Sequence, residues 1–228
     1  MLRLENALIT QGDFTLSADL TLEAEQKYAV IGPSGAGKST LLNALCGFVP
    51  LEQGKLMWQG RDITAQPPGA RPMTMLFQDN NLFPHLTALQ NVVLGVDTGA
   101  KPAKQSLTRA KQALSLVDLA GMEHRRPADL SGGQQSRVAL ARTILSDRAV
   151  IGLDEPFAAL GPGLRREMLD LMAQHLGTRT VLMVTHDPDD ALRIADNTIV
   201  VANGTASSPA PTKALFENPT PHLRDYLG

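Results

Sequence analysis

Residues 27–40 read KYAVIGPSGAGKST, and the class of fold can be predicted from this run. Lys27–Ile31 is a short, mostly apolar run that predicts a buried strand, and Gly32 ends it. Ser39–Cys46 then carries three leucines at helical spacing, with Gly47 as a stop signal. The predicted order is therefore a strand, a glycine-rich loop and a helix.

The loop matches the pattern G-x-x-x-x-G-K-[S/T], which is typical of phosphate-binding loops. Glycines let backbone N–H groups surround a polyphosphate, and the N-terminus of the following helix favours the same anion. Lys38 is expected to neutralise β- and γ-phosphate oxygens, and the Ser39 hydroxyl to bind Mg²⁺. The predicted nucleotide-binding residues here are Gly32, Pro33, Ser34, Gly35, Ala36, Gly37, Lys38, Ser39 and Thr40.

Two carboxylates follow a second apolar run, Ala149–Leu153. Ligand sites lie at the carboxyl ends of parallel strands, which would place Asp154 near the phosphate loop as a ligand of Mg²⁺. Glu155 is then available as the general base for an attacking water. Taken alone, both could equally be solvated loop residues, and it is the phosphate loop that favours the functional interpretation. Gly152 within this strand is unusual, because glycine either weakens a strand or marks a close approach by another element.

His186 follows a third apolar run, Val181–Val184. At a strand end it could hold the γ-phosphate or the attacking water, although a lone histidine there is more often a surface loop residue. Apolar residues between Leu164 and Met172 recur at helical spacing, so strands alternate with helices. This order predicts an α/β domain with a mainly parallel sheet.

Residues 79–147 contain no clear central strand, and apolar residues from Leu107 to Val117 recur at helical spacing. We therefore expect a nucleotide-binding core formed by residues 1–78 and 148–228, with a helical subdomain over residues 79–147. Ala206–Pro211 is rich in small residues and proline, which predicts a loop before a short tail.

Composition excludes several classes of protein. The net charge is −2, and no run of Lys and Arg suggests a nucleic-acid partner. Cys46 is the single cysteine, so no disulfide can form within the chain. Met1–Leu20 carries four charged residues and does not read as a signal peptide, and no window approaches the roughly 18 apolar residues of a membrane span. We expect a cytoplasmic chain that reaches a membrane only through a partner.

Leu130-Ser131-Gly132-Gly133-Gln134 resembles the signature sequence of ABC ATPases. The local chemistry agrees, because Ser131 and two glycines before a helical stretch from Gln134 to Leu145 form a second anion-binding helix start. In the family, the signature of one subunit closes over the ATP that the phosphate loop of the other subunit holds. The resemblance therefore assigns Ser131, Gly132, Gly133 and Gln134 to ATP binding across a dimer.

The other motifs of the family follow in order over nearly the whole chain. Gln78, in Met75-Leu76-Phe77-Gln78-Asp79-Asn80, matches the glutamine that contacts Mg²⁺ and links the core to the helical subdomain, and His186 matches the switch histidine. The resemblance implies one ABC ATPase domain over residues 1–228. Its expected fold is a P-loop NTPase core with a mainly parallel sheet, an N-terminal antiparallel β part and an inserted α-helical subdomain. It also implies ATP and Mg²⁺ as cofactors, a head-to-tail homodimer that forms with ATP, and hydrolysis with Glu155, His186 and Gln78 in catalytic roles.

Three positions depart from the family pattern. Gly161, after Ala158-Ala159-Leu160, replaces an Asp that normally helps the two subunits communicate. Ala24–Lys27 replaces a turn that usually carries Gly-Glu, so a different turn shape is expected. Phe14 is the best candidate by position for stacking on adenine, although a core phenylalanine of an N-terminal strand is an equal alternative. Tyr28 is expected to pack within the sheet.

Met73–Gly95, MTMLFQDNNLFPHLTALQNVVLG, is similar to the ATP-binding subunits of bacterial thiamine importers. The compact length agrees, since related sugar importers carry a further regulatory domain for which this chain has no room. The resemblance implies transmembrane permease subunits and, through them, a periplasmic binding protein, with the chain at the cytoplasmic face of the inner membrane and no nucleic-acid partner.

Other functions stay open at this point. The cargo could be iron, sulfate, a polyamine or a phosphonate, because cargo specificity lies in other subunits. A non-transport ABC ATPase of translation or DNA repair would usually show two ATPase units or a long coiled coil, and neither is seen. A small-molecule kinase would not need Leu130–Gln134. An interaction protein without catalysis is supported by Gly161 alone.

Overall fold

The computed structural model describes residues 1–227. The chain forms two compact units. We call Met1–Met73, Ala149–Glu155 and Thr178–Gly228 the core unit, and Thr74–Arg148 with Pro156–Gly177 the helical unit. This division differs from the expected one chiefly at residues 156–177, whose helix packs on a helix of the helical unit.

Four strands of the core unit form its parallel sheet: β3 (Lys27–Ile31), β7 (Val150–Asp154), β8 (Thr180–Val184) and β9 (Asn197–Ala202). β3 pairs in parallel with β8 and β9, and β7 pairs in parallel with β8. Nearly all their residues are buried, which explains why they read as continuous apolar runs. The predicted α/β class with a mainly parallel core is confirmed.

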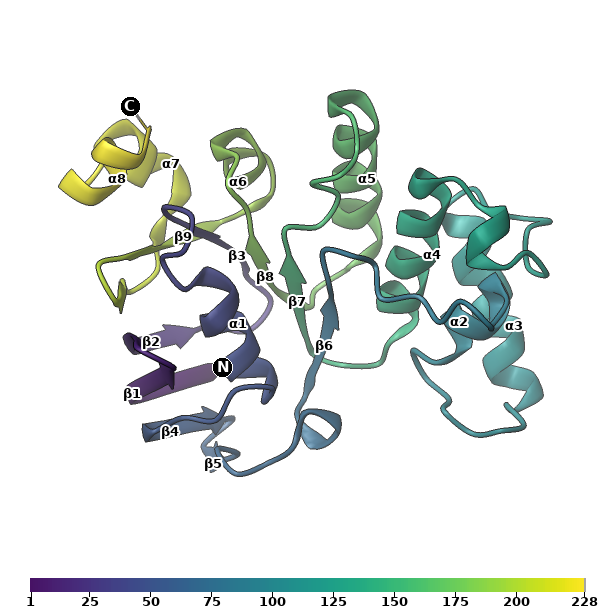
Figure 1. The fold of residues 1–228 in the computed structure, drawn as a ribbon, viewed down its shortest axis with the longest axis horizontal. Coiled ribbons are helices and arrows are strands. Elements are labelled where there is room, and N and C mark those ends of the chain that lie inside the picture. The colour runs from purple at the N-terminus through teal and green to yellow at the C-terminus, as the bar shows by residue number, and fades with distance from the viewer. Residues whose placement is uncertain (228) are drawn as a thin grey trace. The chain divides into compact units, whose positions relative to one another are not determined.

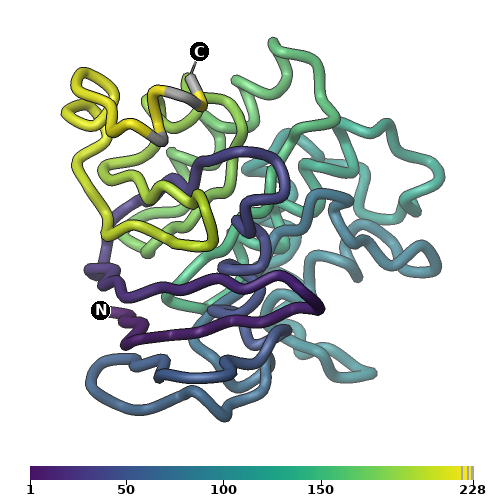
Figure 2. Tube along the Cα trace, turned by 60° about the vertical axis from the view of Figure 1, so that its left-hand side comes forward, coloured from purple at the N-terminus to yellow at the C-terminus, as the bar shows by residue number. Residues whose placement is uncertain are grey.

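The core unit also contains the expected antiparallel part. It contains β1 (Leu2–Gln11), β2 (Phe14–Leu22), β4 (Gln53–Trp58) and β5 (Arg61–Asp62). Figure 2 shows β1 and β2 side by side as the purple hairpin at the N-terminus. The two-residue strand β10 (Thr205–Ala206) joins this part to β9, so the strand order in the core unit is β5-β4-β1-β2-β10-β9-β3-β8-β7.

Helix α1 (Lys38–Cys46) packs against β7, β8 and β1, so it touches both parts of the sheet (Figure 1). Where α1 crosses β7, a Cβ atom on Gly152 would lie 2.9 Å from Leu42 Cδ1 and 3.5 Å from Cys46 Sγ. The structure therefore shows a close approach at Gly152, and its cause is the helix of the phosphate loop. Burial there raises the pKa of the Cys46 thiol to about 12, which suits a packing role and not a reactive one.

Arg71 fixes the far end of α1. Its buried guanidinium donates to the carbonyls of Ala44 (2.6 Å) and Leu45 (2.7 Å), and also to those of Gln66 (2.9 Å) and Thr64 (3.0 Å). The last carbonyls of a helix have no partner within it, so one side chain satisfies two of them. The segment around the short 3₁₀ helix η1 (Pro68–Ala70) is thereby tied to the phosphate-loop helix.

The helical unit begins within β6 (Met73–Leu76) and contains α2 (Ala88–Val93), α3 (Lys104–Leu116), the 3₁₀ helix η2 (Pro127–Asp129), α4 (Gly132–Leu145) and α5 (Pro162–His175). The first three α-helices pack on one another, and α5 packs on α4. The fully buried Asn91 side chain accepts from the Phe83 N–H at 2.8 Å and donates to the Leu86 carbonyl at 3.2 Å. It thereby holds the loop within the stretch that resembles thiamine importers.

The turn at Ala24–Lys27 places Glu25 at φ 63°, in the region that favours glycine. The Glu25 N–H donates to the Thr180 hydroxyl at 3.0 Å, which helps hold this conformation. Tyr28 is buried, as expected, and its hydroxyl oxygen accepts from the Glu23 N–H at 2.7 Å.

The C-terminal region differs from the expected loop and tail. Ala206–Pro211 contains the end of β10 and the strand β11 (Ala210–Pro211), which pairs with β9, and the chain continues as α7 (Thr212–Glu217) and α8 (Pro221–Leu227). The prediction was wrong because two-residue strands are too short to show alternation, and Pro211 is acceptable on an edge strand.

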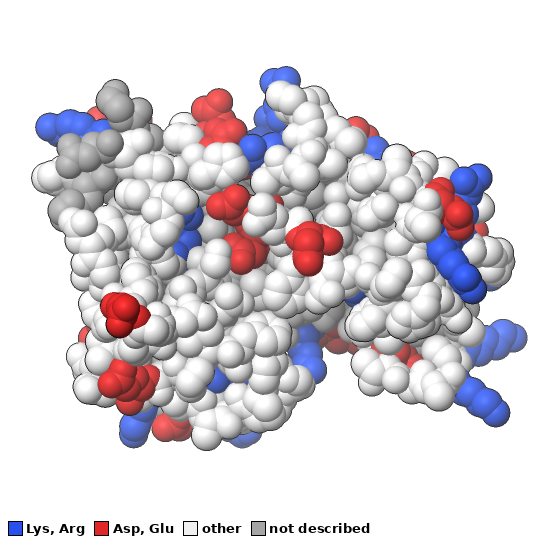
Figure 3. Space-filling view, in the orientation of Figure 1, with Lys and Arg blue, Asp and Glu red and all other residues white. Residues whose placement is uncertain are grey.

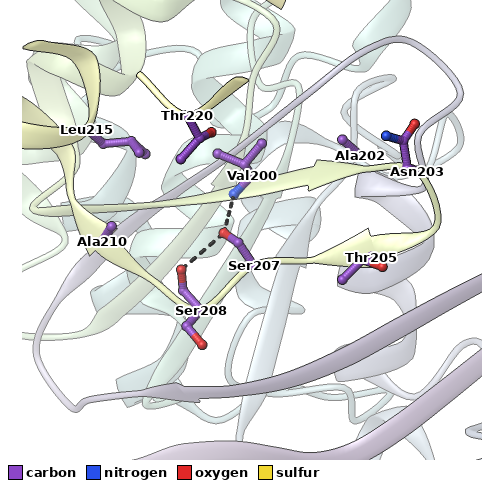
Figure 4. Close-up of a pocket in the computed structure, with 9 residues that line it drawn as sticks. All are labelled: Val200, Ala202, Asn203, Thr205, Ser207, Ser208, Ala210, Leu215 and Thr220. Carbon is purple, nitrogen blue, oxygen red and sulfur yellow. Dashed lines mark hydrogen bonds between the residues drawn. The ribbon is translucent and has the colours of Figure 1, made fainter. Parts of the chain in front are cut away.

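A cavity of about 410 Å³ lies beside this region and is lined mainly by apolar groups. Figure 4 shows Ser207 at its floor, accepting a hydrogen bond from the Val200 N–H at 3.0 Å and donating to the Ser208 carbonyl at 3.0 Å. Leu215 of α7 forms part of the wall. These contacts attach the C-terminal region to β9.

Among the residues that the structure describes, no helix is both long enough and apolar enough to cross a membrane. Basic and acidic side chains are interspersed over the face drawn in Figure 3, with no extended basic patch on it.

Candidate functional site

The phosphate loop opens onto a cavity of about 290 Å³ in the core unit. Its lining comes from three places in the sequence, and the residues are Gln11, Phe14, Ser34, Gly35, Gly37, Lys38, Ser39, Thr40 and Glu155. β3 delivers the chain into the loop and α1 carries it away, so the N-terminus of α1 points at the cavity. Its first N–H groups lack partners within the helix and favour an anion there.

Lys38 is the buried cation of this site. Its ammonium donates to the Gly32 carbonyl at 2.8 Å and to the Pro33 carbonyl at 2.9 Å. Burial lowers the pKa of Lys38, and the carboxylates of Glu155 and Asp154 oppose that shift. A polyphosphate would give this desolvated cation a strong partner.

Phe14 lies against the loop and not in the core. It is half-buried at the start of β2, and a Cβ atom on Gly37 would come within 2.5 Å of its ring. Gly37, at φ 100°, precedes α1 and lets the ring lie close to the loop backbone. The ring lines the phosphate-loop cavity, and its stacking on adenine stays a prediction.

Ser39 and Asp154 meet as the sequence predicts. The Ser39 hydroxyl donates to Asp154 Oδ1 at 2.8 Å, across 115 residues of sequence. Burial raises the pKa of Asp154 and the charge of Glu155 adds to this, while the hydrogen bond from Ser39 and the charge of Lys38 lower it. The Asp154 carboxylate is therefore costly to ionise in the folded protein. A bound cation would offset that cost, because it would interact favourably with the ionised form.

This oxygen pair fits Mg²⁺. Within residues 1–227, no group of three or more His, Cys, Asp and Glu side chains is arranged to hold a metal ion. Mg²⁺ is usually bound by one or two protein oxygens, with phosphates and waters completing its shell. The Ser39 hydroxyl and the Asp154 carboxylate, next to the phosphate loop, provide two such oxygens.

Glu155 lines the cavity, and His186 lies beside it outside the lining residues. His186 Nδ1 lies 3.4 Å from Glu155 Oε2, and the Glu155 side chain is 27% exposed against 54% for His186. Glu155 has φ 44°, an unusual value for a non-glycine residue, and its N–H donates to the Val184 carbonyl at 3.1 Å. Such backbone strain often occurs at functional sites, and here it directs a carboxylate to the cavity.

The signature forms the N-terminus of α4 in the helical unit. Ser131 caps the helix reciprocally with Gln134: the Ser131 hydroxyl accepts from the Gln134 N–H at 3.3 Å, and Gln134 Oε1 accepts from the Ser131 N–H at 2.9 Å. A Cβ atom on Gly133 would lie 2.6 Å from Leu164 Cδ2 of α5, so any larger residue there requires the Leu164 side chain to shift. A second cavity of about 350 Å³ opens at this capped helix start, and the binding of an anion there stays a prediction.

Two further predicted positions lie in the helical unit. Gln78 is exposed in the turn after β6, and its contact with Mg²⁺ stays a prediction. Gly161 precedes α5 in its N-cap position and provides no side-chain cap.

Gln11 was missed by the sequence analysis. It lies at the end of β1, lines the phosphate cavity, and accepts a hydrogen bond from the Thr40 hydroxyl at 3.2 Å. No motif marks it, because its place depends on the pairing of β1 with β2.

A model of the family described as "ABC transporter" matches residues 16–158, which include the phosphate loop, the signature and both carboxylates. This chain belongs to the ABC transporter family. The chain is 55% identical over its full length to a thiamine import ATP-binding protein of Ruegeria sp. and 54% identical to one of Cereibacter sphaeroides, with 100% of each relative covered. One of Photorhabdus laumondii is 43% identical over 97% of this chain and 95% of its own.

A solved structure gives the same fold. A dimeric ATP-binding cassette in a post-hydrolysis state with ADP and phosphate matches with a TM-score of 0.79 and 27% identity, over 93% of this chain and 99% of that one. The ABC chain described here is therefore an ATP-binding P-loop NTPase and an ATPase of that family.

Proposed function

We propose that this ABC ATPase is the motor subunit of a bacterial thiamine importer. The observation that carries this proposal is the full-length identity of 55% to a protein named for thiamine import, together with an intact set of site residues. The chain would act at the cytoplasmic face of the inner membrane, bound to permease subunits that receive cargo from a periplasmic binding protein.

In this proposal, two copies close head to tail around two ATP molecules. The phosphate loop of one copy holds the β- and γ-phosphates, with Lys38 as their buried cation. The capped start of α4 in the other copy faces the same phosphates, because its unpaired N–H groups form a second anion site. Phe14 stacks on the adenine.

Hydrolysis follows from the groups at the cavity wall. Ser39 and Asp154 would hold Mg²⁺, with Gln78 as a further proposed ligand, and the ion would supply neutralisation of phosphate charge. Glu155 accepts the proton of the attacking water, and His186, 3.4 Å from its carboxylate, orients that water and the γ-phosphate. A displacement of Gln78 on hydrolysis would move with the helical unit and pass to the permease subunits.

Uptake and hydrolysis together test the proposal. Cells that lack this chain should lose uptake of labelled thiamine, and wild type should restore it. Glu155→Gln should fail to restore it and should hydrolyse ATP at least about 100-fold more slowly while still binding it, because a general base contributes about that much. Glu217→Gln, at an exposed glutamate of the same unit, is the matched control and should behave as wild type.

Each result has a definite meaning. Restoration by Glu155→Gln would remove Glu155 from the mechanism. Normal thiamine uptake without the chain would refute the cargo and leave the ATPase assignment standing.

A further inference from the structure

The loop that carries His186 is short and is held at several points. It connects β8 to α6 (Pro188–Ile194). The Thr185 hydroxyl donates to Asp190 Oδ2 at 2.9 Å and accepts from the Asp187 N–H at 3.1 Å. These bonds fix the residues on either side of His186.

His186 itself is held by the C-terminal helix. The Tyr226 hydroxyl of α8 donates to the His186 carbonyl at 2.7 Å, across 40 residues. This bond comes from outside the β8–α6 connection, so it ties the loop to a separate element of the core unit.

α8 is anchored so that it can make this bond. Leu223 is fully buried in a cluster that contains Ile31 of β3, Ala191 of α6 and Val200 of β9. Tyr226 lies three residues later, hence on the same face of α8, and packs at the edge of that cluster. In Figure 1, α8 lies beyond α6 at the end of the sheet where β8 stops. The cluster therefore connects Tyr226 to the strand that enters the phosphate loop.

The Tyr226 hydroxyl keeps the proton that it donates to the His186 carbonyl. Burial raises the pKa of Tyr226, and the negative charges of Glu155 and Asp187 raise it further. The phenol is therefore protonated at neutral pH.

We propose that Tyr226 is a positioning residue that holds the backbone of His186 so that its imidazole stays in register with Glu155. The inference rests on the role of His186 in the proposed function. Small displacements of a catalytic group reduce the rate steeply, so a bond that fixes the Cα of His186 should affect kcat more than ATP binding.

Tyr226→Phe is the direct test, because it keeps the packed ring and removes only the donor. Tyr28→Phe is the matched control, since the chain has two tyrosines and Tyr28 also bonds a backbone group, at the start of β3 away from the phosphate loop. We expect Tyr226→Phe to lower kcat about 3- to 10-fold, as the loss of one hydrogen bond allows. KM for ATP should change by less than about twofold and the Tm should stay near that of Tyr28→Phe.

Hydrogen–deuterium exchange gives a readout apart from activity. Amides of residues 185–187 and 189–190 should exchange faster in Tyr226→Phe than in wild type, whereas Tyr28→Phe should leave them unchanged. Unchanged exchange and unchanged kcat in Tyr226→Phe would overturn the inference.

A double variant shows whether Tyr226 acts through His186. If it does, Tyr226→Phe should cause no further loss of rate in a His186→Ala background. An equal loss in both backgrounds would overturn the inference and leave the role of His186 intact. A wild-type rate for His186→Ala alone would instead refute the role of His186 in the proposed function, and the inference with it.

Discussion

Gly152→Ala tests the packing that holds the phosphate loop in place. Gly152 lies in β7 directly under α1, and the added methyl group would come within 2.9 Å of Leu42 Cδ1. Leu42 is buried, so it cannot move aside without disturbing its other neighbours. Either Leu42 leaves its preferred rotamer or α1 moves away from β7.

The expected cost follows from core overpacking. Extra methyl groups in a well-packed core cost about 1–3 kcal/mol. A chain of this size loses about 2–4 °C of Tm per kcal/mol, so the Tm should fall by about 2–12 °C. Because α1 carries Lys38 and Ser39, the shift should also weaken ATP binding at temperatures where the variant is folded.

Thermal unfolding followed by circular dichroism, with ATP titration at 20 °C or so, measures both effects. Gly69→Ala is the control, because nothing lies within 4 Å of a Cβ atom there. Leu42→Ala alone removes a buried side chain and should cost about 2–5 kcal/mol, but the double variant should lose less than the sum of the two. If Gly152→Ala unfolds at the same temperature as Gly69→Ala, α1 does not press on β7 as described.

Three further changes probe other parts of the molecule. Because burial raises the pKa of Asp154 above its usual 3.8, the folded protein binds a proton there more tightly than the unfolded chain. Asp154→Asn should therefore raise the Tm at pH 7. This gain in Tm should shrink as the pH falls through the pKa of Asp154 in the folded protein, and it should vanish below about pH 3.8. Mg²⁺-dependent hydrolysis should be lost in the same variant, and an unchanged Tm at pH 7 would contradict the reasoning. Arg71→Met should lower the free energy of unfolding in urea by at least about 3 kcal/mol, since carbonyls at the end of α1 lose a charged donor, and a loss below about 1 kcal/mol would count against the clamp. Gly161→Asp should stabilise α5 by about 0.3–1 kcal/mol as an N-cap, seen as a small rise in Tm, and unchanged ATP cooperativity and turnover would show that Gly161 is no functional lesion.

Local motifs were predictable because their chemistry is local. The strand, loop and helix of residues 27–46 appear as expected, and Ser131 caps α4 with Gln134 through bonds that span three residues. The meeting of Ser39 with Asp154 was also predictable, because parallel strands end at one edge of the sheet.

The short C-terminal elements were not predictable. β11 has two residues and α7 has six, too few to show a period. Their conformation depends on pairing with β9 and on packing against a core that only the assembled chain provides.

The phosphate loop, the acidic pair, the signature and the family could be predicted from the order of amino acids, because each is a run of residues whose chemistry requires fixed types at fixed spacing. Only the tertiary structure placed Arg71 on the end of α1, Gln11 beside Thr40, and Tyr226 on the carbonyl of His186. These contacts join segments that are distant in sequence, and no spacing records them, because they depend on which buried surfaces pack together.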